Sequence, residues 1–85
     1  MKVKDNFISK HVLDNDIIID KTGSNKNLIK LNETASFMFE KLKEGISLEN
    51  LIEKMAEKYD VNKDVLENDV KEFINKLKEL NIIEE

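Results

Sequence analysis

Few side chains in this sequence belong to the types that carry out catalysis. The chain has a single histidine, His11, and no cysteine that could act as a nucleophile. We find no acidic residue at a helical or cross-strand spacing that would pair with His11, so we interpret it as an ordinary surface or sheet-edge histidine. None of the serines (Ser9, Ser24, Ser36 and Ser47) occurs in a nucleophile elbow, and Ser47 has the position of a helix cap. The sequence therefore predicts a protein that is not an enzyme.

Residues that would hold a cofactor or a metal are equally sparse. Gly23 stands alone, without the glycine run and the following lysine–serine pair that cradle a phosphate group. Carboxylates are abundant, but no second type of ligand accompanies them at metal-binding spacing, a pattern typical of a solvated surface. We therefore expect no cofactor and no metal.

The charge balance limits the partners. All 14 basic residues are lysines, and 18 acidic residues give a net charge of −4. A protein that reads duplex DNA normally has a basic face and uses arginine for guanine, so we expect no nucleic-acid partner. The acidic net charge also disfavours an anionic membrane surface. With no apolar run as long as the roughly 20 residues of a membrane helix, no signal peptide and no cysteine for disulfides, we expect a cytoplasmic protein without a membrane partner.

The length of 85 residues predicts a single domain, residues 1–85. The first third of the chain has the composition of short strands separated by turns. We expect strands over residues 7–13, 17–19 and 27–31. The turns are expected at Asp14-Asn15-Asp16 and at residues 21–26, where Gly23 can adopt a positive φ. Strands this close in sequence pair as an antiparallel meander.

The rest of the chain has the periodicity of helices. Helices are predicted over residues 33–43, 48–58 and 63–80, and the residues that precede them, Asn32, Ser47 and Asn62, suit the capping of a first turn. Gly45 is placed to end the first helix. Each helix carries one apolar stripe with i, i+3, i+4, i+7 spacing. The stripes are Ala35, Met38, Phe39 and Leu42; Leu48, Leu51, Ile52, Met55 and Tyr59; and Leu66, Val70, Phe73, Ile74, Leu77 and Leu80.

The predicted fold class is α+β, a three-stranded antiparallel sheet followed by three helices in the order β-β-β-α-α-α. The tail, residues 81–83, is expected to be either a fourth short strand or a hydrophobic plug. A meander leaves an unpaired edge on its first or third strand, and such an edge can accept an extended peptide as an added strand. The third helix has a broad apolar stripe with Ile74 at one margin and Lys71 and Lys78 just outside it. The third strand and this margin could therefore form the walls of a peptide groove.

Several stretches of the sequence resemble one family. Leu31-Asn32-Glu33-Thr34-Ala35, then Phe37-Met38-Phe39-Glu40-Lys41-Leu42 and Gly45, resemble the "LNETAA-x-hydrophobic-aromatic-E-L-L-x-G" core of the PqqD-like family. Ser47-Leu48-Glu49-Asn50-Leu51-Ile52 is similar to its "T-hydrophobic-E-E-I-hydrophobic" second helix. Tyr59-Asp60-Val61, the long third helix and the closing Leu80-Asn81-Ile82-Ile83 follow in the expected order. The chain departs from the pattern at Phe39, where many members have tryptophan, and at Asn81, where glycine is common.

The resemblance implies a function for the groove. The family, also called the RiPP recognition element, has a winged-helix-like fold of three strands and three helices. It binds the leader of a ribosomally made precursor peptide as an extra strand on its third strand, in the cleft beside its third helix. It presents the peptide to a modifying enzyme, such as a radical SAM protein or a leader peptidase, and is not itself catalytic. Lysines at the margin of the cleft would suit a leader that carries Asp or Glu. The peptide-binding residues implied by the resemblance are Leu28, Ile29, Lys30, Leu31, Val70, Lys71, Phe73, Ile74, Leu77 and Lys78.

Two other functions stay open on the residues alone. A winged-helix DNA-binding regulator would have a similar fold, but its recognition helix should carry clustered basic residues, whereas residues 63–80 alternate acidic and basic ones. A small structural homodimer is the second alternative. Five apolar residues of the third helix have the 4-3-4-3 spacing of a coiled-coil seam, although two heptads are short for one. The leading interpretation is itself compatible with a monomer or a homodimer.

Overall fold

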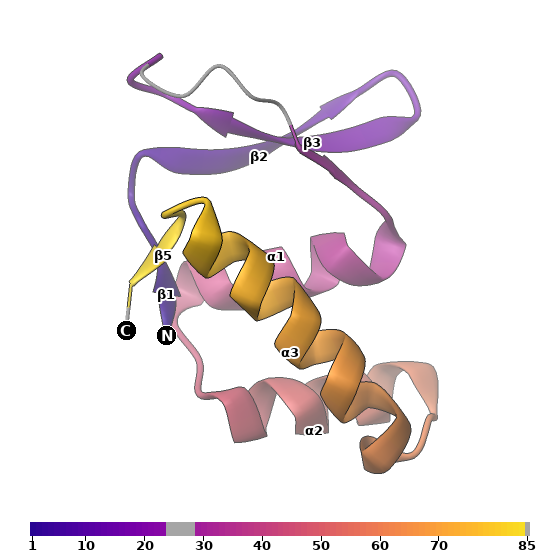
Figure 1. The fold of residues 1–85 in the computed structure, drawn as a ribbon. Helices are drawn as coiled ribbons and strands as arrows, with labels where there is room; N and C mark the ends of the chain where they lie inside the picture. Colours follow the sequence, from indigo (N-terminus) through magenta and orange to yellow (C-terminus); the bar gives the residue numbers. More distant parts are fainter. Residues whose placement is uncertain (24–28, 85) are drawn as a thin grey trace.

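The computed structural model describes residues 1–23 and 29–84. A three-stranded antiparallel sheet lies at one end of the molecule and the three helices lie beside and below it (Figure 1). The predicted α+β fold, with this sheet preceding three helices, is confirmed. The elements in chain order are β1 (Lys2–Val3), β2 (Phe7–Val12), β3 (Asn15–Asp20), β4 (Ile29–Leu31), α1 (Glu33–Glu44), α2 (Leu48–Tyr59), α3 (Lys63–Glu79) and β5 (Ile83–Glu84).

The main sheet has the strand order β2-β3-β4, and both pairs are antiparallel. Val12 pairs with Asn15, so the turn between β2 and β3 consists of only Leu13 and Asp14. The turn predicted at Asp14-Asn15-Asp16 is therefore displaced, because Asn15 and Asp16 belong to β3. A two-residue hairpin turn needs a positive φ in at least one position, and Leu13 adopts a φ of 56°. Leucine is not a turn-favouring residue, which is why composition misplaces this turn.

A second, two-stranded sheet joins the ends of the described chain. β1 pairs antiparallel with β5, with Lys2 opposite Glu84 and Val3 opposite Ile83. The tail is thus both a short strand and a hydrophobic plug, because Ile83 lies in a strand while Ile82 and Ile83 are buried in the core. β1 was not predicted from the sequence. A strand of two residues is too short to show any periodicity.

The helices begin where the sequence predicts. Asn32, Ser47 and Asn62 each accept a hydrogen bond from a backbone N–H of the first helical turn. Gly45 follows α1 with a φ of 92°, a conformation that favours glycine. The C-terminal ends lie one residue from the predicted ones, a difference typical of fraying helix ends.

One hydrophobic core connects the sheets to the helices. Val3 of β1, Ile18 of β3, Phe39 of α1 and Leu77 of α3 are each 2% exposed or less. All the side chains that are buried in the described part of the chain are apolar. The core therefore extends under the middle strand of the main sheet, and both edges of that sheet rest on it.

An aromatic pair fixes α1 against α2. The ring centroids of Phe37 and Tyr59 are 6.0 Å apart, and the rings meet edge to face at 85°. The ammonium groups of Lys41 and Lys58 lie 5.5 and 5.0 Å from the Phe37 centroid, within the range of a cation–π interaction. Burial, and then the charge of Glu33, raise the pKa of Tyr59 above its ordinary value. These contacts hold α1 in place, and other residues of α1 line the site described next.

Candidate peptide-binding site

The outer edge of β4 is one of the two edges of the main sheet (Figure 1). The Lys21 N–H donates to the Asn6 carbonyl at 2.7 Å, which identifies these residues as a hydrogen-bonded pair of the antiparallel ladder. Such pairs recur at every second residue. The main-chain groups of Ile18, three residues before Lys21, therefore face away from β2 and toward β4. There Ile18 exchanges its hydrogen bonds with Ile29, the residue opposite it. The N–H and C=O of the next residue, Lys30, point away from β3 toward the edge.

β4 thus offers a peptide one well-defined pairing position. A strand laid beside it could exchange two main-chain hydrogen bonds with Lys30, whose side chain is exposed. Ile29 is half-buried and Leu31 is buried. The predicted pairing residue Leu28 lies outside the described residues. Because one main-chain hydrogen bond contributes only about 0.5–1.5 kcal/mol net, so short an edge needs side-chain contacts to hold a peptide firmly.

A pocket of about 340 Å³ opens where β4 ends and α1 begins. Ala35 and Met38 of α1 and Phe73 of α3 form its apolar floor. Asn32, the residue after β4, also lines the pocket, and its side-chain oxygen caps α1 by accepting from the Ala35 N–H at 2.8 Å. The volume is at the low end of the roughly 300–1,000 Å³ of ligand pockets, so the space suits a peptide side chain better than a large cofactor.

Three charged residues of α3 line the same pocket. Asp69, Glu72 and Lys76 are separated by three and four residues, so they share one flank of the helix with Phe73. All three side chains are exposed. None of them forms an ion pair with another residue that the structure describes. The rim contributed by α3 therefore carries two negative charges and one positive charge.

The predicted apolar residues of α3 divide between the core and the pocket. Val70, Ile74 and Leu77 are between 0% and 4% exposed and belong to the core. Phe73 is half-buried and lines the pocket. The hollow therefore lies at the Phe73 margin of the apolar stripe, whereas the sequence placed the groove at the Ile74 margin. The amphipathic pattern of the sequence does not distinguish the two margins of the apolar stripe. The position of α1 decides which margin borders the pocket.

The two predicted lysines of α3 lie away from the pocket. At about 100° per residue, Lys71 and Lys78 fall on the flank of α3 opposite Lys76. The Lys71 Nζ is 2.8 Å from the Glu67 Oε1, one helical turn earlier. Neither lysine lines the pocket between α1 and α3. Their contact with a peptide stays a prediction.

Sequence reasoning missed most of the residues that line the pocket. The row Asp69, Glu72 and Lys76 could have been found, because it stands at helical spacing beside Phe73. The residues of α1, Thr34, Ala35 and Met38, could not have been assigned to the same site from the pattern. Their part in it depends on how α1 packs against α3, which is a tertiary feature.

The sequence matches one family model. Residues 17–83, from β3 to β5, match the family described as coenzyme PQQ synthesis protein D (PqqD). The chain belongs to the PqqD family. No curated protein matches the sequence.

Two solved structures share the fold of this PqqD-family chain. The complex of TbiB1 with the TbiA(beta) leader peptide is 23% identical to it with a TM-score of 0.82, and the match covers 99% of this chain and 95% of that chain. Lasso peptide synthetase B1, complexed with the leader peptide, is 18% identical with a TM-score of 0.76, and the match covers 95% of this chain and 93% of that chain. At these identities the likeness establishes the fold.

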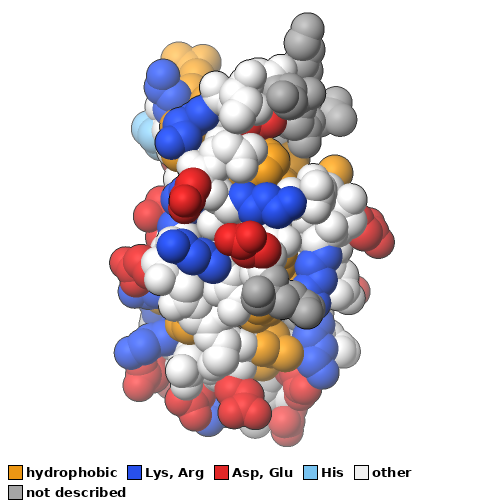
Figure 2. All heavy atoms as spheres, turned by 90° about the vertical axis from the view of Figure 1, so that its left-hand side faces the viewer, with side chains coloured by type: hydrophobic (Ala, Val, Ile, Leu, Met, Phe, Trp, Pro, Cys, Tyr) orange, Lys and Arg blue, Asp and Glu red, His pale blue; other side chains and the backbone are white. Residues whose placement is uncertain are grey.

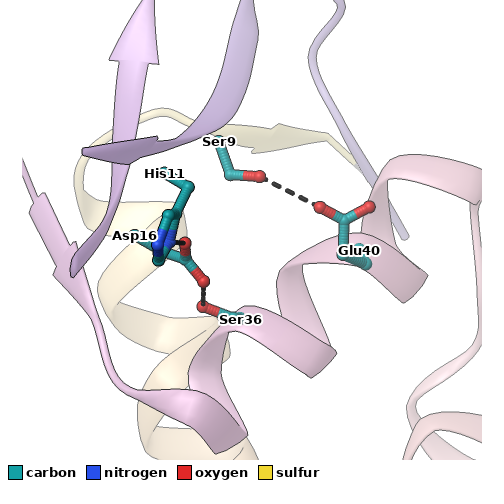
Figure 3. Close-up of polar contacts among 5 residues, drawn as sticks. All are labelled: Ser9, His11, Asp16, Ser36 and Glu40. Carbon is teal, nitrogen blue, oxygen red and sulfur yellow. Dashed lines mark hydrogen bonds and ion pairs between the residues drawn. The ribbon is translucent and has the colours of Figure 1, made fainter. Parts of the chain in front are cut away.

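A group of polar side chains links β2 and β3 of the PqqD-family fold to α1 (Figure 3). The His11 Nδ1 lies 2.7 Å from the Asp16 Oδ1, and the Ser36 Oγ donates to the Asp16 Oδ2 at 2.7 Å. Nearby, the Ser9 Oγ donates to the Glu40 Oε1 at 3.0 Å. The expectation that His11 has no acidic partner is wrong, because Asp16 stands directly opposite it in the register. The misplaced turn hid this pairing by assigning Asp16 to a loop.

This group has the residue types of a catalytic triad without its arrangement. The Asp16 carboxylate lies between the serine and the histidine, whereas a nucleophilic serine needs the histidine on its own hydroxyl. The hydrogen bond from Ser36, followed by that with His11, lowers the pKa of Asp16 below its ordinary value. The group therefore acts as a polar tie between the sheet and α1. In residues 1–23 and 29–84, no three His, Cys, Asp or Glu side chains are grouped to hold a metal ion.

Acidic and basic side chains are interspersed on the surface. Figure 2 shows the face that carries β1, β5 and the termini, where red and blue side chains lie next to one another rather than gathering by sign. A protein that binds duplex DNA needs a basic patch or stripe, so this face gives the DNA-binding alternative no support. Among the described helices, none has both the length and the apolar character needed to cross a membrane.

Proposed function

We propose that this PqqD-family chain is a recognition module that binds the leader of a ribosomally made precursor peptide and presents it to a modifying enzyme. The leader is added as a strand to the edge of β4 and places a side chain in the pocket between α1 and α3. One observation carries the proposal: the outward backbone groups of Lys30 lie two residues before Asn32, which lines the pocket. A strand paired with β4 is therefore led directly over the pocket.

Similarity to other proteins supports this proposal in two ways. Membership of the PqqD family relates the chain to proteins of coenzyme synthesis. TbiB1 and lasso peptide synthetase B1, which share the fold over nearly their whole length, were both solved with leader peptides. A common fold with a sheet edge beside a helix makes strand addition the binding mode to test first.

The proposal assigns different roles to the predicted binding residues. Ile29, Lys30 and Leu31 form the pairing strand, and Leu28 extends it. Phe73 contacts the leader in the pocket, while Val70, Ile74 and Leu77 hold α3 in place from the core. Lys71 and Lys78, on the far flank of α3, would steer an acidic leader from a distance, an effect that acts mainly on the association rate.

The partner enzyme in this proposal is a radical SAM protein or a leader peptidase, and the complex forms in the cytoplasm. The chain itself performs no chemistry. Its contribution is to raise the effective concentration of the peptide at the enzyme by holding the leader.

An amide-resolved NMR titration with the leader peptide encoded beside the gene tests this function. We expect shifts at residues 29–31 and 69–76 that saturate at micromolar peptide. The outer face of α2, for example Glu49 and Glu57, should stay unchanged and serves as the internal control. An unchanged spectrum with every neighbouring leader would refute leader recognition. If residues 29–31 instead shift with protein concentration and not with peptide, β4 pairs with a second copy and the homodimer alternative is correct.

A further inference from the structure

We infer that the pocket between α1 and α3 selects leaders by an apolar side chain that fills it and a lysine or arginine next to that side chain. This inference rests on the proposed function, because it describes the peptide chemistry that the same site accepts. It follows from the difference between two parts of the pocket, its apolar floor and the charged rim that α3 contributes.

The floor of the pocket favours an apolar side chain. Met38 is 5% exposed, and Ala35 and Phe73 pack against the core beside it. The polar atoms near the floor are already engaged in capping α1. The Thr34 Oγ1 donates to the Asn32 Oδ1 at 2.9 Å, and the same oxygen accepts from the Ala35 N–H. An aliphatic or aromatic side chain would remove this apolar surface from water, at roughly 25 cal/mol for each Å².

The rim of the pocket favours a positive charge next to that side chain. Lys76 stands four residues after Glu72, the spacing at which opposite charges on a helix offset one another. Asp69 has no cation at that position, because residue 73 is the phenylalanine of the floor. Because neither carboxylate forms an ion pair, two carboxylates and one lysine leave this flank with a net negative charge. Asp69 lies one turn before Phe73. A cationic residue beside the buried side chain of the peptide would meet it.

This preference is opposite to the one that the sequence indicated. The expectation of an acidic leader was based on Lys71 and Lys78, which lie on the other flank of α3. Only the carboxylate-bearing flank lines the pocket. Charge selection at the pocket should therefore favour lysine or arginine even if the rest of the leader is acidic.

A reciprocal exchange of charge tests the inference. The pocket variant Asp69→Lys/Glu72→Lys is compared with the control Glu44→Lys/Glu57→Lys, whose exposed carboxylates lie on α1 and α2 and do not line this pocket. Each replacement of a carboxylate by lysine raises the net charge by two units. Both double variants therefore change the net charge from −4 to 0. The probes are the leader encoded beside the gene and a copy in which each lysine and arginine of its bound segment is replaced by glutamate. Binding is followed by fluorescence anisotropy.

The pocket variant should bind the native leader roughly tenfold more weakly than the wild-type chain, because attraction is replaced by repulsion at two exposed pairs. It should also bind the glutamate copy more tightly than the wild-type chain does, while the control should change either affinity less than about twofold. The neutral variant Asp69→Asn/Glu72→Gln should show a loss of roughly threefold, which separates charge from misfolding.

Equal effects of the pocket and control variants would overturn the inference and leave leader binding intact. A bound leader segment that contains neither lysine nor arginine would overturn it as well. If the wild-type chain binds neither peptide, the proposed function fails and the inference fails with it. The titrations distinguish the first outcome from the third, and the sequence of the leader's bound segment decides the second.

Discussion

β2 and β4 are the two edge strands of the main sheet, and their outward backbone groups have different surroundings. The outer edge of β2 is closed where it begins, because the Phe7 N–H donates to the Lys4 carbonyl at 3.1 Å and the Phe7 carbonyl accepts from the Lys43 Nζ at 2.7 Å. On β4, the outward groups of Lys30 stand beside a pocket. Proteins commonly protect sheet edges against unwanted pairing. The two edges therefore differ at these positions, and only the outward groups of Lys30 stand beside the pocket between α1 and α3.

The difference between the edges originates in α1. One flank of this helix faces β2 and β3, where Ser36, Glu40 and Lys43 bind to the strands. The other flank turns Ala35 and Met38 into the pocket beside β4. A single helix thus ties down one side of the sheet and leaves a hollow at the other. Asymmetry of this kind lets a small sheet bind one peptide at one edge.

The largest expected effect comes from removing the support that both edges share. Ile18 lies in the middle strand and is 2% exposed, so Ile18→Ala should destabilise the fold by about 2–5 kcal/mol. That is a large part of the roughly 5–15 kcal/mol by which domains are stable. Urea unfolding followed by circular dichroism measures the loss. The neighbouring Ile17, which is only half-buried, supplies the control Ile17→Ala with a smaller expected cost. Similar losses for both variants would show that the sheet is not anchored through Ile18.

The comparison of the edges is tested directly by placing proline on each of them. Lys30→Pro removes the outward N–H of β4 without breaking a bond to β3, so the fold should tolerate it. Leader affinity should fall roughly 10- to 100-fold, because a peptide carbonyl loses its donor, at a cost of about 1–3 kcal/mol. Isothermal titration calorimetry with the leader gives the change. Ser9→Pro, the equivalent replacement on β2, should leave affinity within about twofold of the wild type. A larger loss from Ser9→Pro than from Lys30→Pro would place the peptide on β2.

The junction of β4 with α1 should affect both stability and binding. Asn32→Ala removes the cap of α1 and should cost about 1 kcal/mol, as should Asn62→Ala at the start of α3. Only Asn32 lines the pocket, so only its replacement should also weaken leader binding, by a few-fold. Thermal unfolding and peptide titration of the two variants provide the measurements. Equal affinities for the two variants would mean that the leader does not reach the start of α1.

Local signals account for what the sequence could predict. Helices 33–44, 48–59 and 63–79 each begin at a side chain that caps them, and the same cap residues are recognisable in the sequence. The strands were recognised by their β-branched residues, but the hairpin turn at Leu13 was not, because a leucine with a positive φ is unusual. That one displacement hid the pairing of His11 with Asp16.

The candidate site was harder to predict than the fold because it combines distant segments. The strand half was expected correctly as an edge, since any meander has one. The helix half was predicted at the Ile74 margin of α3, whereas the pocket lies at the Phe73 margin, because an apolar stripe does not show which margin lies against another helix. Phe73, which the sequence left between core and groove, is the residue that reaches the pocket. The charged residues of the rim can be assigned to the pocket only when the position of α1 is known.

The smallest expected effect concerns the polar tie on the protected side of the sheet. Hydrogen bonds with Ser36 and His11 lower the pKa of Asp16 in the fold below its ordinary value of 3.8. A depressed folded pKa adds stability at pH values above the unfolded pKa, and this contribution is lost as the pH falls through the folded pKa. In Ser36→Ala the Asp16 pKa should return toward its ordinary value, which a carboxyl-detected NMR titration measures directly. The stability difference between wild type and variant should therefore shrink on acidification below about pH 4. Leader binding at neutral pH should be unchanged, because neither Ser36 nor Asp16 lines the pocket between α1 and α3. A difference in stability that is constant with pH would show that Ser36 acts through packing and not through the charge of Asp16.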